Sequence, residues 1–60
     1  MHEIYSYIDA DKQAIDVYFI DGNVGITLSD LLEEQEGPIV WLTPAQARKL
    51  SDVLRDVSAS

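Results

Sequence analysis

The stretch IDVYFIDGNVGITL, residues 15–28, decides the fold of this chain. Apolar side chains recur at every second position on both sides of the central DGN, which is the pattern of two half-buried β-strands. Asp21-Gly22 and Gly22-Asn23 supply the positive φ angles that tight hairpin turns require. These residues therefore predict a β-hairpin.

Two further strands are expected on either side of this hairpin. The segment EIYSYI alternates in the same way and is followed by the polar connection DADKQ. PIVWLT is a short apolar strand that begins at Pro38, where a missing N–H does least harm. The predicted strands cover residues 3–8, 14–20, 23–28 and 38–42.

The last segment, LTPAQARKLSDVLRDV, predicts a helix over residues 44–58. Thr43 is the N-cap, Pro44 occupies the first helical position, and Gln46 completes a capping box. Apolar residues recur every three or four positions and form one stripe along the helix. The stripe consists of Ala47, Leu50, Val53, Leu54 and Val57.

These elements predict one small α+β domain, residues 1–60, with two layers. About four mainly antiparallel strands form a sheet, and the C-terminal amphipathic helix packs on one of its faces. The face under the helix is expected to carry Ile4, Ile8, Ile15, Val17, Phe19, Val24, Ile26, Leu28, Val40 and Leu42. The opposite face would carry Tyr5, Tyr7, Tyr18, Ile20, Ile39 and Trp41. Such an uncovered aromatic face is typical of an interface.

The charge of the chain is strongly negative and unevenly distributed. Asp and Glu number 11 against four Lys and Arg, a net charge of −7. Residues 1–43 hold nine of the acids against Lys12 alone, whereas residues 44–60 are slightly basic. The densest segment is SDLLEEQEG, residues 29–37, which could form one helical turn or a loop. This balance disfavours direct binding to nucleic acid or to anionic membranes and favours a basic partner.

Catalysis, metal binding and membrane insertion find no support in the residues. His2 is the single histidine and there is no cysteine, so disulfides, thiolate zinc sites and the usual nucleophile–base pairs are missing. DADKQA begins like a calcium loop, but Ala14 and Ile20 occupy its obligatory glycine and glutamate positions. We expect no catalytic residue, no metal and no cofactor. Without a membrane span or signal peptide, a cytoplasmic location is expected.

A small acidic protein can occupy the basic groove that a DNA-handling enzyme offers to phosphates. We expect the acidic segment to provide phosphate surrogates and the aromatic residues of the sheet to anchor the contact. The candidate partner-binding residues are Ser29, Asp30, Glu33, Glu34, Glu36, Tyr5, Tyr7, Tyr18 and Trp41.

Two resemblances bear on this hypothesis. WLTPAQARKLSDVL resembles the end of many small acidic proteins of actinobacteria and their phages, whose LTPxQAxxLxxxL motif marks a strand running into a helix. In size, acidity and element types, the whole chain resembles the phage inhibitors of uracil-DNA glycosylase. That resemblance implies a DNA mimic that sequesters the enzyme, with the segment ITLSDLLEEQEG as its acidic element.

Other functions are compatible with the same residues. The chain could be a homodimeric structural or accessory module whose aromatic sheet face is its self-interface. It could be an antitoxin-like partner of a basic protein or another phage counter-defence protein. Its acidity could also serve solubility alone.

Overall fold

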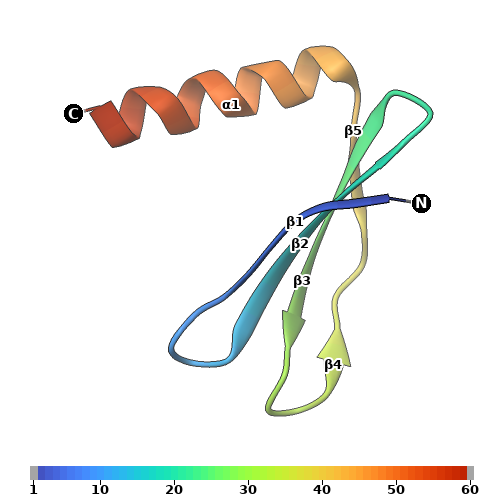
Figure 1. The fold of residues 1–60 in the computed structure, drawn as a ribbon, viewed down its shortest axis with the longest axis vertical. Helices are drawn as coiled ribbons and strands as arrows, with labels where there is room; N and C mark the ends of the chain where they lie inside the picture. Colours follow the sequence, from blue (N-terminus) through green and yellow to red (C-terminus); the bar gives the residue numbers. More distant parts are fainter. Residues whose placement is uncertain (1, 60) are drawn as a thin grey trace.

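A computed structural model describes residues 2–59 of the chain. They form an antiparallel sheet followed by a C-terminal helix, as predicted for a small α+β domain (Figure 1). The elements are β1 (His2–Ile8), β2 (Gln13–Ile20), β3 (Asn23–Asp30), β4 (Gln35–Glu36), β5 (Val40–Leu42) and α1 (Pro44–Ala59).

Strands β2 and β3 form the predicted hairpin. Ile20 pairs with Asn23, so Asp21 and Gly22 are the two residues of the turn. Their φ angles are +50° and +83°, which is the primed turn geometry that matches the twist of the strands. Gly22 tolerates this angle because it has no Cβ. The hairpin forms the centre of the sheet.

Strand β1 pairs with β2 across a turn that is closed by Asp9. The Oδ1 atom of Asp9 accepts hydrogen bonds from the N–H groups of Asp11 and Gln13, both at 2.9 Å. The β1–β2 register shifts between Glu3 and Tyr5, which marks a β-bulge around Ile4.

Two short strands, β4 and β5, lie along the same edge of β3. Strand β4 pairs with Ser29 and Asp30, and β5 pairs with the other end of β3, from Val24 to Ile26. The single strand predicted over 38–42 is therefore shortened to β5. The chain between these two strands contains Pro38, which has no N–H to donate to β3.

The acidic segment forms a turn between β3 and β4, which resolves the choice between helix and loop. Ser29 and Asp30 still belong to β3, and the turn follows them. The Oδ1 atom of Asp30 accepts hydrogen bonds from the N–H groups of Leu32 at 3.0 Å and Glu33 at 3.3 Å. An aspartate that bonds its own downstream backbone favours a turn over a helix.

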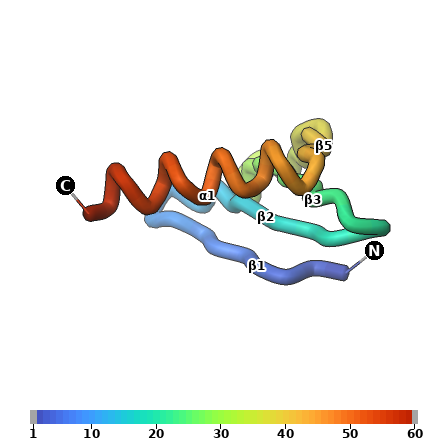
Figure 2. Tube along the Cα trace, turned by 90° about the horizontal axis from the view of Figure 1, so that it is seen from above, coloured from blue at the N-terminus to red at the C-terminus, as the bar shows by residue number. Residues whose placement is uncertain are grey.

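Helix α1 begins at the predicted capping box. The N–H of Thr43 donates to Gln46 Oε1 at 3.0 Å, and the N–H of Gln46 donates to Thr43 Oγ1 at 3.3 Å. The helix lies on one side of the sheet (Figure 2). Within residues 2–59 it comes close to β3 and β5 but not to β1 or β2. It therefore covers only part of the sheet.

The chain is more open than a folded monomer of its length. It exposes 4807 Å² of surface, whereas a compact protein of this size would expose roughly 3,900 Å². Its radius of gyration is 12.7 Å, compared with about 10 Å for a compact domain of 60 residues. Among the hydrophobic side chains of residues 2–59, only Ala14 is buried. The helix and the sheet enclose little core between them.

In the described part of the chain, no helix has both the length and the apolar character needed to cross a membrane.

Candidate functional site

The strand register divides the sheet into two chemically different faces, because successive side chains of a strand point to opposite sides. We call the face toward α1 the near face and the other the far face. The near face carries Tyr5, Tyr7, Ile15, Val17, Phe19, Val24, Ile26, Leu28, Val40 and Leu42. The far face carries Glu3, Ser6, Ile8, Asp16, Tyr18, Ile20, Thr27, Ser29, Glu36 and Trp41.

The predicted placement of β1 on these faces is wrong. Tyr5 pairs with Val17 and Tyr7 with Ile15, so both tyrosines lie on the near face, toward the helix. Alternation in the segment EIYSYI fits either orientation of the strand. The observed orientation is fixed by the polar partner of Ser6. The Ser6 hydroxyl donates to a carboxylate oxygen of Asp16 at 2.8 Å on the far face.

Ile8 belongs to the far face for the same reason, since it lies two residues after Ser6. The bulge around Ile4 adds a second change. It places Glu3 opposite Tyr18, on the far face, although Glu3 lies an odd number of positions, three, before Ser6. Two of the candidate aromatic residues, Tyr18 and Trp41, lie on the far face as expected.

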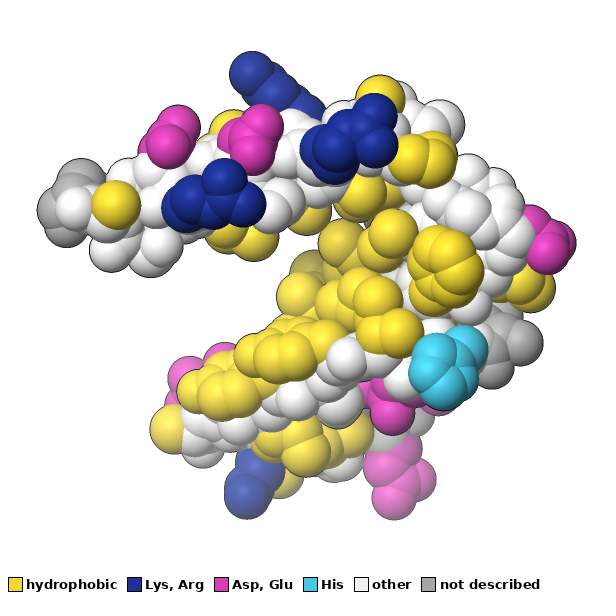
Figure 3. Space-filling view, turned by 45° about the horizontal axis from the view of Figure 1, so that its top comes forward, with side chains coloured by type: hydrophobic (Ala, Val, Ile, Leu, Met, Phe, Trp, Pro, Cys, Tyr) yellow, Lys and Arg dark blue, Asp and Glu magenta, His cyan; other side chains and the backbone are white. Residues whose placement is uncertain are grey.

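An apolar cleft opens between α1 and the near face. Its volume is about 320 Å³, and none of the residues that line it carries a charge. Figure 3 shows a C-shaped molecule with hydrophobic side chains along the inner sides of both arms. Exposure increases along the helix, from 38% at Leu50 to 59% at Leu54. The lining residues are Tyr5, Ile15, Val17, Val24, Ile26, Leu42, Ala47, Leu50, Ser51 and Leu54.

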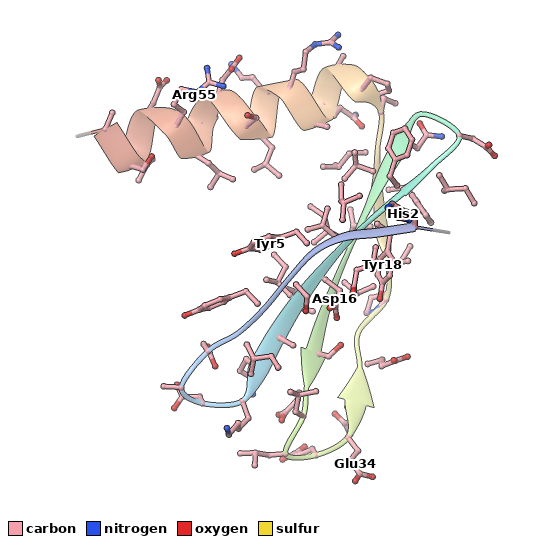
Figure 4. The ribbon with its side chains drawn as sticks, in the orientation of Figure 1. His2, Tyr5, Asp16, Tyr18, Glu34 and Arg55 are labelled. Carbon is pink, nitrogen blue, oxygen red and sulfur yellow. The ribbon has the colours of Figure 1, made fainter. Side chains whose placement is uncertain are left out.

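The far face carries an acidic group around Tyr18. Partial burial raises the pKa of the Tyr18 hydroxyl, and the negative charges of Asp16, Glu3 and Glu36 raise it further. A hydrogen bond with Thr27 lowers this pKa and offsets part of the rise. Figure 4 shows Asp16 and Tyr18 side by side in the middle of the sheet. Three strands thus contribute carboxylates to one tyrosine.

Asp16 lies close enough to Glu3 to affect the protonation of the Glu3 carboxylate. A hydrogen bond shared with the Asp16 side chain raises the pKa of Glu3, and burial and the negative charge of Asp16 add to that rise. A carboxyl pair favours the state that holds one proton, because two adjacent negative charges repel. A cationic side chain bound here would remove the same repulsion.

An acidic hollow of about 310 Å³ lies at the β3–β4 end of the sheet. Four carboxylates belong to its lining, together with Ser29, Leu31 and Gln35. The hollow brings together four of the five predicted acidic-segment residues and leaves Glu33 outside. Its four carboxylates come from Asp16, Asp30, Glu34 and Glu36.

Asp16 and Glu3 were missing from the candidate residues predicted from the sequence. Asp16 could have been found, because it lies two residues from Tyr18 and therefore on the same face of β2. Glu3 could not have been found in this way, because the bulge around Ile4 changes its face. Only the observed register shift brings Glu3 to Tyr18.

Two turns rich in acidic residues lie at one end of the sheet (Figure 1). They are the β1–β2 turn, with Asp9 and Asp11, and the β3–β4 turn, with Glu33 and Glu34. The N–H of Leu31 donates to the carbonyl oxygen of Lys12 at 3.0 Å, which joins the β3–β4 turn to the β1–β2 turn. Lys12 is the one cation that precedes α1. The other three cations belong to the helix, and Figure 3 shows them on its outer side. Most of the negative charge thus belongs to the sheet and its turns, and three of the four cations belong to the helix.

Trp41 lies across a glycine at the centre of the far face. Tyr18, Gly25 and Trp41 are cross-strand neighbours on β2, β3 and β5. A Cβ atom at Gly25 would lie 2.7 Å from the Cζ3 atom of the Trp41 ring, so the ring occupies the space of the missing side chain. The far face therefore combines a flat aromatic surface with the acidic group.

Within residues 2–59, no three His, Asp or Glu side chains are arranged to hold a metal ion. No family model, no curated protein and no solved structure matches the chain.

Proposed function

We propose that this chain is a non-catalytic inhibitor that mimics DNA and occupies the basic groove of a DNA-processing enzyme. The observation that carries the proposal is the acidic hollow, which is lined by four carboxylates from three strands and a turn and by no cation. The two acidic turns extend this negative surface along one end of the sheet.

Such a surface suits a basic groove for electrostatic reasons. Closely spaced carboxylates on a rigid sheet replace the regularly spaced phosphates of a duplex, and their field accelerates the encounter with a positive partner. The hollow can receive a lysine or arginine side chain of the target between the carboxylates of Asp16, Glu34 and Glu36. Trp41 and Tyr18 then supply apolar contact that exposed ion pairs do not provide.

A uracil-DNA glycosylase is the first target that we propose. The reason is the resemblance of the chain to the phage inhibitors of that enzyme in size, acidity and element types. The inhibitor would then act in the cytosol, where it competes with DNA for the enzyme.

The first experiment is capture from bacterial lysate on the immobilised protein, followed by elution with duplex DNA. Mimicry predicts that DNA displaces a basic DNA-processing enzyme, which mass spectrometry identifies. A direct assay then titrates the protein against uracil-DNA glycosylase and measures uracil excision. Absence of inhibition overturns this target, and absence of any DNA-displaced protein overturns mimicry itself.

A matched pair of variants tests the surface. Glu34→Gln with Glu36→Gln removes two charges from the acidic hollow, and we expect binding to weaken at least tenfold and to depend less on salt. Asp52→Asn with Asp56→Asn removes two charges from α1, away from the hollow, and should leave binding nearly unchanged. Equal effects of the two pairs would mean that only net charge matters.

A further inference from the structure

We infer that the apolar cleft between α1 and the near face is closed by a second copy of this chain, in a two-fold symmetric homodimer. This inference goes beyond the proposed function and is independent of it, because the acidic surface belongs to the far face and the sheet end. It also assigns the self-interface to a different face from the one expected from the sequence.

The area left open matches what a dimer needs. The chain exposes 4807 Å², about 900 Å² more than a compact monomer of its length. A stable protein interface covers about 800 Å² on each partner. One interface of ordinary size would therefore bring each copy to the exposure of a compact protein.

The charge distribution selects a second copy as the occupant. Each chain carries a net charge of −7, so two copies repel each other over most of their surfaces. The cleft is lined only by uncharged residues, and Asp16 and Glu36 of the acidic hollow lie on the far face. The near face is thus the surface on which two copies meet with least repulsion, whereas a basic partner gains nothing from it.

The cleft is also self-complementary. The near face remains open beyond the reach of its own helix, where Tyr7 is 56% and Leu28 is 65% exposed. The helix in turn presents apolar residues that the sheet of its own chain does not cover, such as Leu54. A two-fold axis places the helix of each copy over the open near face of the other, so that both apolar surfaces are buried.

Helix stability supports the same arrangement. An isolated amphipathic helix of 16 residues is marginal in water, and most helical stability in proteins comes from packing of the apolar face. The end of α1 that is farthest from β5 has little of its own sheet to pack on (Figures 1 and 3). A second copy provides that missing surface.

The test is sedimentation of the wild-type protein and two variants over a concentration series. Leu54→Glu places a charge in the cleft, and Leu32→Glu makes the same change in the β3–β4 turn at a side chain that is 73% exposed. We expect a wild-type dimer at micromolar concentration, a dissociation constant raised roughly 100-fold or more by Leu54→Glu, and no change from Leu32→Glu. A wild-type protein that stays monomeric overturns the inference.

A second measurement does not depend on whether Leu54→Glu folds. In a mixture of labelled and unlabelled wild-type chains, isotope-filtered NMR detects only contacts between copies. Contacts between the Leu54 methyl groups and the Tyr7 ring support the inference. Contacts that involve Trp41 instead would place the interface on the far face and overturn it.

Discussion

The two faces of the sheet are opposite in character although the same strands build them. The near face presents Val17 and Ile26 to an uncharged cleft, whereas the far face presents Asp16 and Glu36 around Tyr18. The near face can bind only through contact and water exclusion, which act at short range. The far face acts through charge, which reaches about 10 Å at ordinary salt concentration.

One thin sheet can therefore support two independent kinds of association. Apolar contact needs a partner of complementary shape, whereas a charged surface needs a partner of opposite sign. Because the faces share no side chain, a change on one face should leave the function of the other nearly intact.

Raising the salt concentration should weaken binding of a basic partner but should not weaken self-association. Raising the salt concentration from about 0.05 M to about 0.5 M shortens the range of charge interactions roughly threefold. We expect capture of a basic partner to weaken by at least tenfold, because its attraction to the far face is screened. Self-association should persist or strengthen, because the repulsion between two chains of charge −7 is screened as well.

Sedimentation and partner binding at the same series of salt concentrations check this prediction. Sodium chloride and potassium chloride serve as matched salts, so that specific ion binding is recognised. Loss of both associations with rising salt would mean that charge also holds the two copies together.

Gly25→Ala should disturb the aromatic surface of the far face. The new Cβ would lie 2.7 Å from the Trp41 ring, so the ring must move off the strand. We expect a loss of about 1–3 kcal/mol in the free energy of unfolding and a red shift in tryptophan fluorescence. Urea denaturation followed by fluorescence measures both.

The control for Gly25→Ala is the same change in a Trp41→Ala background, where no ring opposes the new methyl group. The loss in the free energy of unfolding should be clearly smaller in that background. An equal cost in both backgrounds would locate the effect in the β3 backbone and not in the ring.

Thr43→Ala should weaken the helical arm of the cleft. It removes the Oγ1 atom that accepts a hydrogen bond from the N–H of Gln46. Loss of an N-cap costs about 1 kcal/mol, and we expect that loss in the free energy of unfolding. Thr43→Ser keeps the oxygen and should restore most of the stability. Circular dichroism at increasing temperature measures the order of the three proteins.

Glu3→Gln should stabilise the protein slightly at neutral pH. The pKa of Glu3 is raised in the folded state, so its contribution to stability is present in acid and is lost as the pH rises through the folded pKa. The variant carries no charge next to Asp16. Its advantage over the wild type should therefore appear near neutral pH and vanish as the pH falls into the ordinary range of glutamate pKa values.

Thermal unfolding between acidic and neutral pH checks this prediction. Glu33→Gln is the matched control, since it removes one charge from the β3–β4 turn and not from the far face. An advantage of Glu3→Gln that is equal at every pH would contradict the shared hydrogen bond with Asp16.

Local signals in the sequence determined the hairpin turn and the start of the helix. Asp21 and Gly22 form the hairpin turn because glycine, and to a lesser degree aspartate, tolerates positive φ. Thr43 and Gln46 start the helix because their side chains bond the free N–H groups at its first turn. Each signal acts within a few residues, so it can be predicted without knowing the rest of the fold.

Which residues share a surface could be known only from the tertiary structure. Strand alternation separates Tyr5 from Ser6 but does not say which of them faces the helix. The bulge around Ile4 carries Glu3 to Tyr18, and pairing of β4 with β3 carries Glu36 there. These contacts join residues that are distant in the chain, and nothing local specifies them.

The hairpin, the helix, the α+β class and the excess of negative charge could all be predicted from the amino-acid sequence. The tertiary structure shows that α1 leaves Tyr7 and Leu28 of the near face exposed and that the carboxylates of Asp16, Glu34 and Glu36 share one hollow. The difference arises from how far apart in the chain the interacting residues are. Turns and caps depend on neighbours in the chain, whereas a face depends on strand register and on the angle at which the helix leaves β5.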